Sequence, residues 1–168
     1  MQTGSNRHLS VRLSDKEEGD EMTSLTTDNF AQEAERVIRE LRESEGNDRR
    51  KGSNSSSSDV TTTQLRNMLA MTVELCADIQ NETSDKLNEE IRGQINYLKI
   101  RFVYAASKET KVRDFIKKAN ILKYLDEVGD SRNKFILFSR YMEALVAYHG
   151  FLIGSRNLEP ADQDSLVG

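Results

Sequence analysis

The chain has 168 residues, of which 36% are apolar and 31% charged; since globular domains are usually about 45–50% apolar, part of it is expected to lack a core. One cysteine excludes a disulfide framework and a cysteine-rich zinc site, and no apolar run approaches the roughly 18 residues of a membrane span. The net charge is −4 and the acidic first thirty residues resemble neither a signal nor a transit peptide, which predicts a soluble cytoplasmic protein without membrane contacts.

Residues 1–59 are predicted to form a mostly disordered, acidic arm. A serine-rich tract at 53–58 cannot bury apolar area and is expected to be a flexible linker. One helix is predicted within the arm at 28–45, with Asp28 as its N-cap and apolar residues at steps of three and four: Phe30, Ala34, Val37, Ile38 and Leu41. Its apolar stripe is thin, so this helix is expected to be marginal alone. Deletion of the arm is therefore expected to leave the remainder folded.

Residues 60–154 are predicted to form a helical bundle, and 155–168 a polar tail. Thr61 and Gln64 fit a capping box at the start of a first helix. A second helix is expected to end near Lys108, and the next helix to begin near Thr110. The expected helix ranges are 62–80, 86–108, 110–119, 121–128 and 133–153.

Single residues mark the boundaries of the last three helices. The apolar phase of the third pattern slips near Asn120, which predicts two short helices with a bend between them. Gly129 suits a left-handed helix end, and Ser131 suits the cap of the last helix. No segment alternates apolar and polar residues long enough to indicate a strand. The predicted fold is therefore all-α: a compact bundle of about five helices preceded by a flexible N-terminal arm.

Catalytic and metal-binding patterns are missing from the sequence. His149 falls on the inner face of the last helix and Cys76 on that of the first bundle helix, where both are expected to be core residues. There is no Gly-rich phosphate loop, G-x-S-x-G or H-E-x-x-H motif, and no Glu-x-x-His pair. We therefore predict no enzyme activity, no metal and no cofactor, although an enzyme of unfamiliar type remains open.

The second bundle helix has the most informative pattern. Tyr97, Arg101, Tyr104 and Lys108 recur at steps of four, three and four, about 110° from the core stripe. Cations alternating with tyrosines suit RNA, because cations meet phosphates and aromatic rings stack or bond to ribose. In the alternative interpretation, the tyrosines pack at the edge of the bundle while the cations stay solvated.

Other cations lie close in sequence. Residues 92–140 hold twelve Lys/Arg and five Asp/Glu, a net charge of +7, which indicates a site for a polyanion. For Arg140, an intrahelical ion pair with Glu143 is a simpler explanation than RNA binding. The candidate RNA-binding residues are Lys99, Arg101, Tyr104, Lys108, Lys111, Arg113, Lys117, Lys118 and Arg140.

Four segments closely resemble, in order, the small-subunit family of the type III-A CRISPR effector, the Csm complex: TTTQLRNMLAMT, INYLKIRFVYAASKE, VRDFIKKANILKYLDEVGDS and KFILFSRYMEALVAYH. The resemblance covers about Thr61 to Phe151, which makes residues 1–59 an extension peculiar to this protein or its lineage. Where family members often read Tyr-Glu-Ala-Gly-Arg, this chain has Tyr104 to Lys108, so a longer helix is expected here. Gly150 replaces a basic or aromatic residue of the family.

The resemblance implies a non-catalytic RNA-binding protein of antiviral defence. Its implied partners are the backbones of guide RNA and target RNA, the backbone filament and large subunit of the effector, and neighbouring copies of itself. Contacts to phosphate without sequence readout would suit this role, because guide pairing supplies the specificity. A second hypothesis remains open from the residues: a helical adaptor that joins proteins and never binds nucleic acid. Salt-dependent RNA binding would separate the two.

Overall fold

The computed structural model describes residues 24–50 and 60–153, and these contain six helices and no strand. This confirms the predicted all-α bundle. The predictions for the remainder of the arm, for the serine-rich linker and for the tail concern residues outside the described ranges. The helices are α1 (Phe30–Arg50), α2 (Thr62–Gln80), α3 (Glu89–Lys108), α4 (Thr110–Lys118), α5 (Ile121–Glu127) and α6 (Arg132–Leu152).

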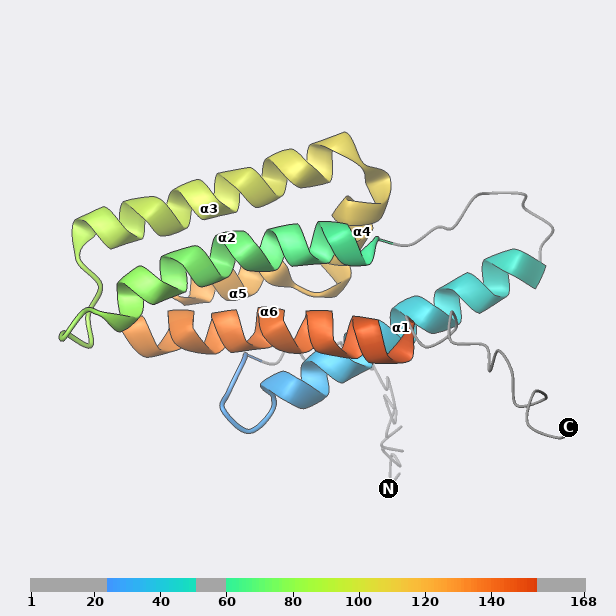
Figure 1. Cartoon of the computed structure of the whole chain (residues 1–168), viewed down its shortest axis with the longest axis horizontal. Coiled ribbons are helices and arrows are strands. Elements are labelled where there is room, and N and C mark those ends of the chain that lie inside the picture. The colour runs from blue at the N-terminus through green and yellow to red at the C-terminus, as the bar shows by residue number, and fades with distance from the viewer. Residues whose placement is uncertain (1–23, 51–59, 154–168) are drawn as a thin grey trace, which may run out of the picture.

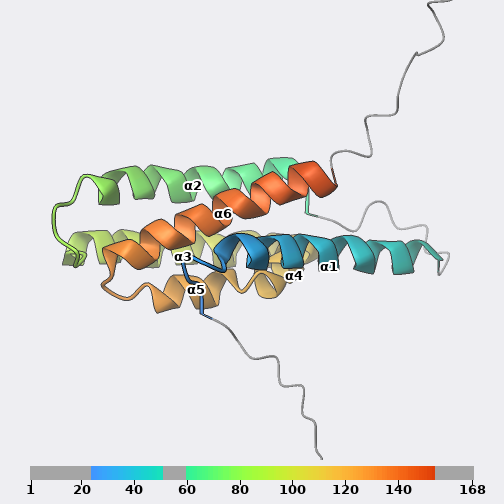
Figure 2. The ribbon, with the colours of Figure 1, turned by 90° about the horizontal axis from the view of Figure 1, so that it is seen from below.

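The helices form an elongated bundle (Figure 1). α2 and α3 lie side by side as an antiparallel hairpin, and α6 packs along α2 on one side and α1 on the other. The short helices α4 and α5 run back along α3, and α5 also packs against α6 (Figure 2). In both views the C-terminal part of α1 extends beyond the end of α6.

The start of α2 has the predicted capping box. Thr61 Oγ1 accepts a hydrogen bond from the Gln64 backbone N–H at 3.2 Å, and Gln64 Oε1 accepts one from the Thr61 N–H at 2.8 Å. These two bonds satisfy N–H groups that have no partner within the helix. The sequence therefore locates this helix start correctly.

α3 begins three residues later than the predicted Lys86, because two connecting segments pair with each other instead. The Leu87 N–H donates to Asp130 O at 2.8 Å and the Arg132 N–H to Asp85 O at 3.0 Å. Asn88 then caps the helix, its side-chain oxygen accepting from the Ile91 N–H at 2.8 Å. This long-range pairing has no signal in the local sequence.

The bend predicted near Asn120 is present. Asn120 has φ 49°, a left-handed conformation that asparagine tolerates better than most residues, and it separates α4 from α5. Gly129 has φ 54° after α5, as predicted, and Ser131 caps α6 by accepting from the Lys134 N–H at 3.3 Å. A hydrogen bond from α6 stabilises the bend, since the buried Tyr141 hydroxyl donates to Ala119 O at 2.9 Å.

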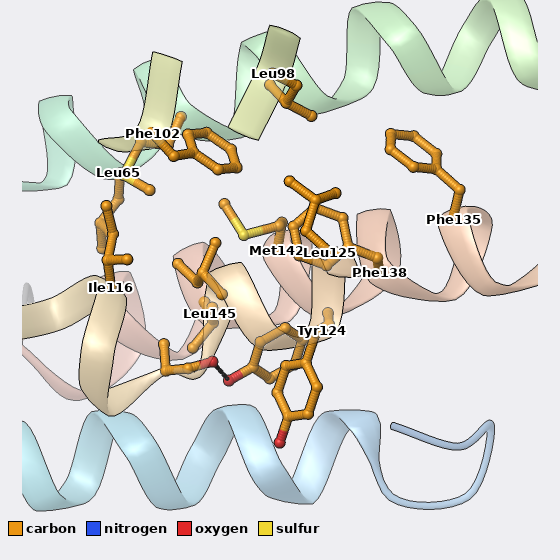
Figure 3. Close-up of a cluster of buried hydrophobic side chains, with 14 of the residues drawn as sticks. Leu65, Leu98, Phe102, Ile116, Tyr124, Leu125, Phe135, Phe138, Met142 and Leu145 are labelled. Atoms are coloured by element: carbon orange, nitrogen blue, oxygen red, sulfur yellow. Dashed lines mark hydrogen bonds between the residues drawn. The ribbon is translucent and has the colours of Figure 1, made fainter. Parts of the chain in front are cut away.

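One continuous hydrophobic core runs through the bundle (Figure 3). Aromatic side chains from α3, α4 and α6 fill its centre, and Tyr124 meets Tyr141 edge to face with ring centroids 5.3 Å apart. The largest fully buried side chains include Phe102, Phe115, Phe135, Phe138 and Tyr141.

α1 belongs to this core, which the sequence did not predict. Ala34, Val37 and Ile38 are completely buried, and the helix packs along α6. The Tyr124 hydroxyl also donates to Glu33 Oε1 at 3.3 Å, which joins α5 to α1. Burial raises the pKa of Tyr124 to about 12, and the hydrogen bonds of Arg36 lower the pKa of Glu33. The expectation that residues 1–59 can be deleted harmlessly therefore conflicts with the packing of α1.

Candidate nucleic-acid interface

The predicted tyrosine and arginine stripe lies on the surface of α3. Tyr97 is 63% exposed and Tyr104 62% exposed, and Arg101 between them is also exposed. The Lys108 ammonium lies 4.9 Å from the centre of the Tyr104 ring, within range of a cation–π interaction. Neither tyrosine is buried at the edge of the bundle, so both rings are accessible to a partner.

α4 places a second set of cations next to the end of α3. Val112, Phe115 and Ile116 are buried, so Arg113 and Lys117, one turn apart, lie on the exposed side. The helices meet after a single intervening residue, and Arg113 Nε donates to Ala106 O on α3 at 3.3 Å. Arg101, Tyr104 and Lys108 near the end of α3 and Arg113 and Lys117 of α4 are thus all exposed, and we call this region the α3–α4 corner.

Two other lysines of α4 are partly engaged with the protein. Lys118 Nζ lies 3.3 Å from Ser44 Oγ of α1, and its side chain is half-buried. Lys111 is also half-buried. Both add positive charge near the corner, but binding an anion would require Lys118 to exchange its contact with Ser44.

Two predicted site residues lie apart from this corner. Lys99 forms an ion pair with Asp126 of α5 at 2.5 Å, which offsets its charge. Arg140 is exposed on α6, and the predicted ion pair with Glu143 does not form among the described residues. Spacing of three residues permits such a pair, but exposed pairs gain only about 0.2–0.5 kcal/mol, too little to fix two long side chains.

A groove between α2 and α3 adjoins Arg101, and the sequence did not reveal it. Glu74 and Asp78 line its α2 side, one turn apart, and Tyr97 and Arg101 line its α3 side. The only sequence signal for this groove was that Glu74 and Asp78 are four residues apart and lie outside the apolar face of α2. Many solvated helices have the same pattern. Because these carboxylates of α2 face Tyr97 and Arg101, the groove next to the α3 stripe is acidic, whereas the end of the stripe near Lys108 is basic.

His149 is a core residue with hydrogen-bonding partners, as predicted. It is 3% exposed, with Nε2 3.1 Å from Val60 O and Nδ1 3.3 Å from Thr62 Oγ1. Because a carbonyl can only accept, this network assigns the proton to Nε2 and lets Thr62 donate to Nδ1. Burial lowers the pKa of His149 despite the bond to Val60. The side chain ties the end of α6 to the start of α2.

This burial predicts a pH dependence of stability. The unfolded chain binds a proton at His149 below about pH 6.5, whereas the folded chain binds it only at lower pH, so the free energy of unfolding should fall as pH decreases below about 6.5. Urea unfolding at pH 5, 6, 7 and 8 measures this slope. His149→Gln should flatten it between pH 5 and 7, while His8→Gln serves as control for the second histidine. An unchanged slope in His149→Gln would contradict the assignment.

The described residues include no group of three or more His, Cys, Asp or Glu side chains placed to hold a metal ion. No helix among them is long and apolar enough to cross a bilayer. Cys76 is buried in α2, with Gln80 Nε2 3.7 Å from its sulfur.

The chain matches known proteins over most of its length. The profile of the Csm2 Type III-A family matches residues 27–155. The CRISPR system Cms protein Csm2 of Streptococcus thermophilus is 36% identical over 133 residues, which cover 79% of this chain and 98% of that protein. Its namesake in Mycobacterium tuberculosis (strain CDC 1551 / Oshkosh) is 39% identical over 94 residues, 56% of this chain and 76% of the relative. Another from Enterococcus italicus is 36% identical over 94 residues, 55% and 67% of the two chains.

The family match begins at residue 27 and so includes α1, whereas the resemblance in the sequence began at Thr61. The expectation that residues 1–59 are peculiar to this protein is therefore wrong for the part that contains α1. The profile covers most of the chain, and the Streptococcus relative aligns over nearly its whole length. The chain thus belongs to the Csm2 Type III-A family, the small-subunit family of the Csm effector complex that its sequence resembles.

Proposed function

We propose that this small subunit contacts the phosphates of the guide–target RNA duplex within the Csm complex, without reading sequence and without catalysing a reaction. The observation that supports this most directly is the α3–α4 corner, where Arg101, Lys108, Arg113 and Lys117 are all exposed and Lys108 lies over the exposed Tyr104 ring. Cations bind phosphate oxygens through charge-assisted hydrogen bonds, and exposed aromatic rings stack on bases or contact ribose.

Assembly into the complex would raise the RNA affinity, which is weak for a single copy of the chain. As a Csm2 protein the chain works beside other Csm subunits, and we place the RNA channel, the backbone filament, the large subunit and neighbouring copies among its partners. Each copy supplies only a few phosphate contacts, so linked copies gain affinity through effective concentration. An isolated chain should therefore bind RNA only weakly.

The test of this function is the salt dependence of RNA binding. Fluorescence anisotropy with two RNA duplexes of unrelated sequence should give equal affinities, and the logarithm of the binding constant should fall linearly with the logarithm of salt concentration. A helical adaptor that never binds nucleic acid would show no such binding. Affinity that ignores salt, or that prefers one duplex, would contradict contact through phosphates.

Arg101→Ala should weaken RNA binding without affecting the fold. Arg101 is exposed, so circular dichroism and Tm should stay nearly unchanged. A lost charge-assisted contact to phosphate should lower the affinity of the assembled complex by about 1 kcal/mol or more.

Arg140→Ala is the matched control, since Arg140 is also exposed but lies on α6, away from the α3–α4 corner. It should reduce RNA affinity less than Arg101→Ala does. An equal loss in both variants would mean that the RNA surface extends over α6. Unfolding of Arg101→Ala would instead show that this arginine supports the fold.

A further inference from the structure

The outer face of α3 is apolar, although no described element covers it. Tyr97, Ile100 and Tyr104 are each more than 60% exposed, and Val103 is 48% exposed. They lie on the side of the helix away from the buried Ile95, Leu98 and Phe102. Single exposed apolar residues are common, but a contiguous set of large ones on one helix face indicates a docking surface.

The α2–α3 groove borders this face and is large enough for one side chain. Its volume is about 250 Å³, below the roughly 300–1,000 Å³ of pockets that hold drug-sized ligands. Two carboxylates stand on one wall, an exposed tyrosine ring on the other, and buried leucines form the floor. The lining residues are Met71, Glu74, Leu75, Asp78, Gln94, Tyr97, Leu98 and Arg101.

The charges of the groove determine what can enter it. Glu74 and Asp78 form no ion pair among the described residues, and neither does Arg101 at the other end. Two carboxylates against one guanidinium leave the lining with a net charge of −1. A phosphate would meet repulsion on the α2 wall, whereas a cation would be attracted there.

We infer that this groove binds an arginine or lysine side chain presented by a helix of a partner protein. The cationic head would reach Glu74 and Asp78, and its methylene stem would lie over Leu75 and Leu98. The Tyr97 ring would contribute a cation–π contact. An apolar residue one turn along the partner helix would then cover Ile100, as helices docked in grooves do.

This inference goes beyond RNA binding, because it concerns the acidic side of Arg101 and not the α3–α4 corner. Arg101 would mark the boundary at which the protein-binding surface meets the RNA-binding surface. The two surfaces can therefore fail or succeed separately in experiments.

The test uses N-acetyl-arginine methylamide as probe and its uncharged isostere, N-acetyl-citrulline methylamide, as control ligand. Titrations of the full chain are followed by ¹H–¹⁵N NMR. Arginine should shift the amides of 71–78 and 94–101 and bind at least threefold more tightly than citrulline. The variant Glu74→Gln/Asp78→Asn should lose that difference while keeping its circular dichroism. Glu143→Gln, an exposed carboxylate of α6, should bind as the wild type does.

Four results would overturn the inference. The two probes could bind equally, or their shifts could map elsewhere and persist in the double variant. A short RNA duplex could shift the same groove amides, which would make this an RNA surface. Lastly, the same amides could shift with protein concentration in the absence of probe, which would make the occupant a second copy of the chain.

Discussion

Ile38→Ala in α1 should lower the free energy of unfolding by about 2–5 kcal/mol and decrease Tm by roughly 10 °C. Ile38 is completely buried between α1 and the bundle. The substitution removes apolar contacts and leaves a cavity, because the packed α6 side chains can relax only in part. Thermal melts followed by circular dichroism measure the change. Gln32→Ala, an exposed position of the same helix, should shift Tm by no more than a degree or two.

Deletion of residues 1–59 should have a still larger effect. It removes Ala34, Val37, Ile38 and Leu41 together and exposes the face of α6 that they cover. We expect a Tm lower by well over 10 °C, or a shortened chain that does not fold cooperatively. A truncated chain that melts within a few degrees of the full chain would show that α1 adds little to stability despite its burial.

The sequence predicted α1 as a helix but not its place in the core, and the reason is physical. Periodicity reports the apolar face of a helix, and Val37, Ile38 and Leu41 were recognised on that basis. What that face packs against depends on the complementary surface of α6, which lies more than ninety residues away. The thin stripe suggested a weak helix, yet Ala34, Val37 and Ile38 are completely buried where α1 packs along α6.

Local signals performed best where a few neighbouring residues determine the outcome. The Thr61 capping box, the left-handed Asn120 and the left-handed Gly129 all depend on side chains or backbone freedom within a few residues. The predicted start of α3 was wrong because residues 85–87 pair with residues 130–132. That pairing exists only after the chain has folded, so no local pattern could show it.

The candidate site was predicted in part for the same reason. Helical spacing placed Arg101 and Tyr104 on one exposed stripe, and the structure confirms their exposure. Spacing could not show that Asp126 would reach Lys99, or that Glu74 and Asp78 would face Arg101 across a groove. Charges along one helix are visible in sequence, whereas charges contributed by the neighbouring helix are not. Which cations touch phosphate stays a prediction.

Neutralising Arg113 and Lys117 together should have the largest effect on RNA binding. Both are exposed one turn apart on α4, at the corner where Lys108 also lies. Arg113→Gln/Lys117→Gln should weaken target RNA binding by the assembled complex by about 2 kcal/mol, roughly 30-fold, if each contacts one phosphate. The slope of log affinity against log salt should also become shallower by about two units.

The matched control is Lys86→Gln/Lys134→Gln, which changes the net charge equally at the opposite end of the bundle, where the loop before α3 meets the start of α6 (Figure 1). A general electrostatic attraction would make the two double variants equivalent, because only the total charge would matter. A phosphate contact at α4 requires the corner variant to lose both affinity and salt slope while the control keeps them. If instead the control loses as much, the positive charge acts at long range and α4 is no binding site. If neither variant changes while Arg101→Ala does, the RNA surface ends on α3, and the cations of α4 are ordinary solvated side chains.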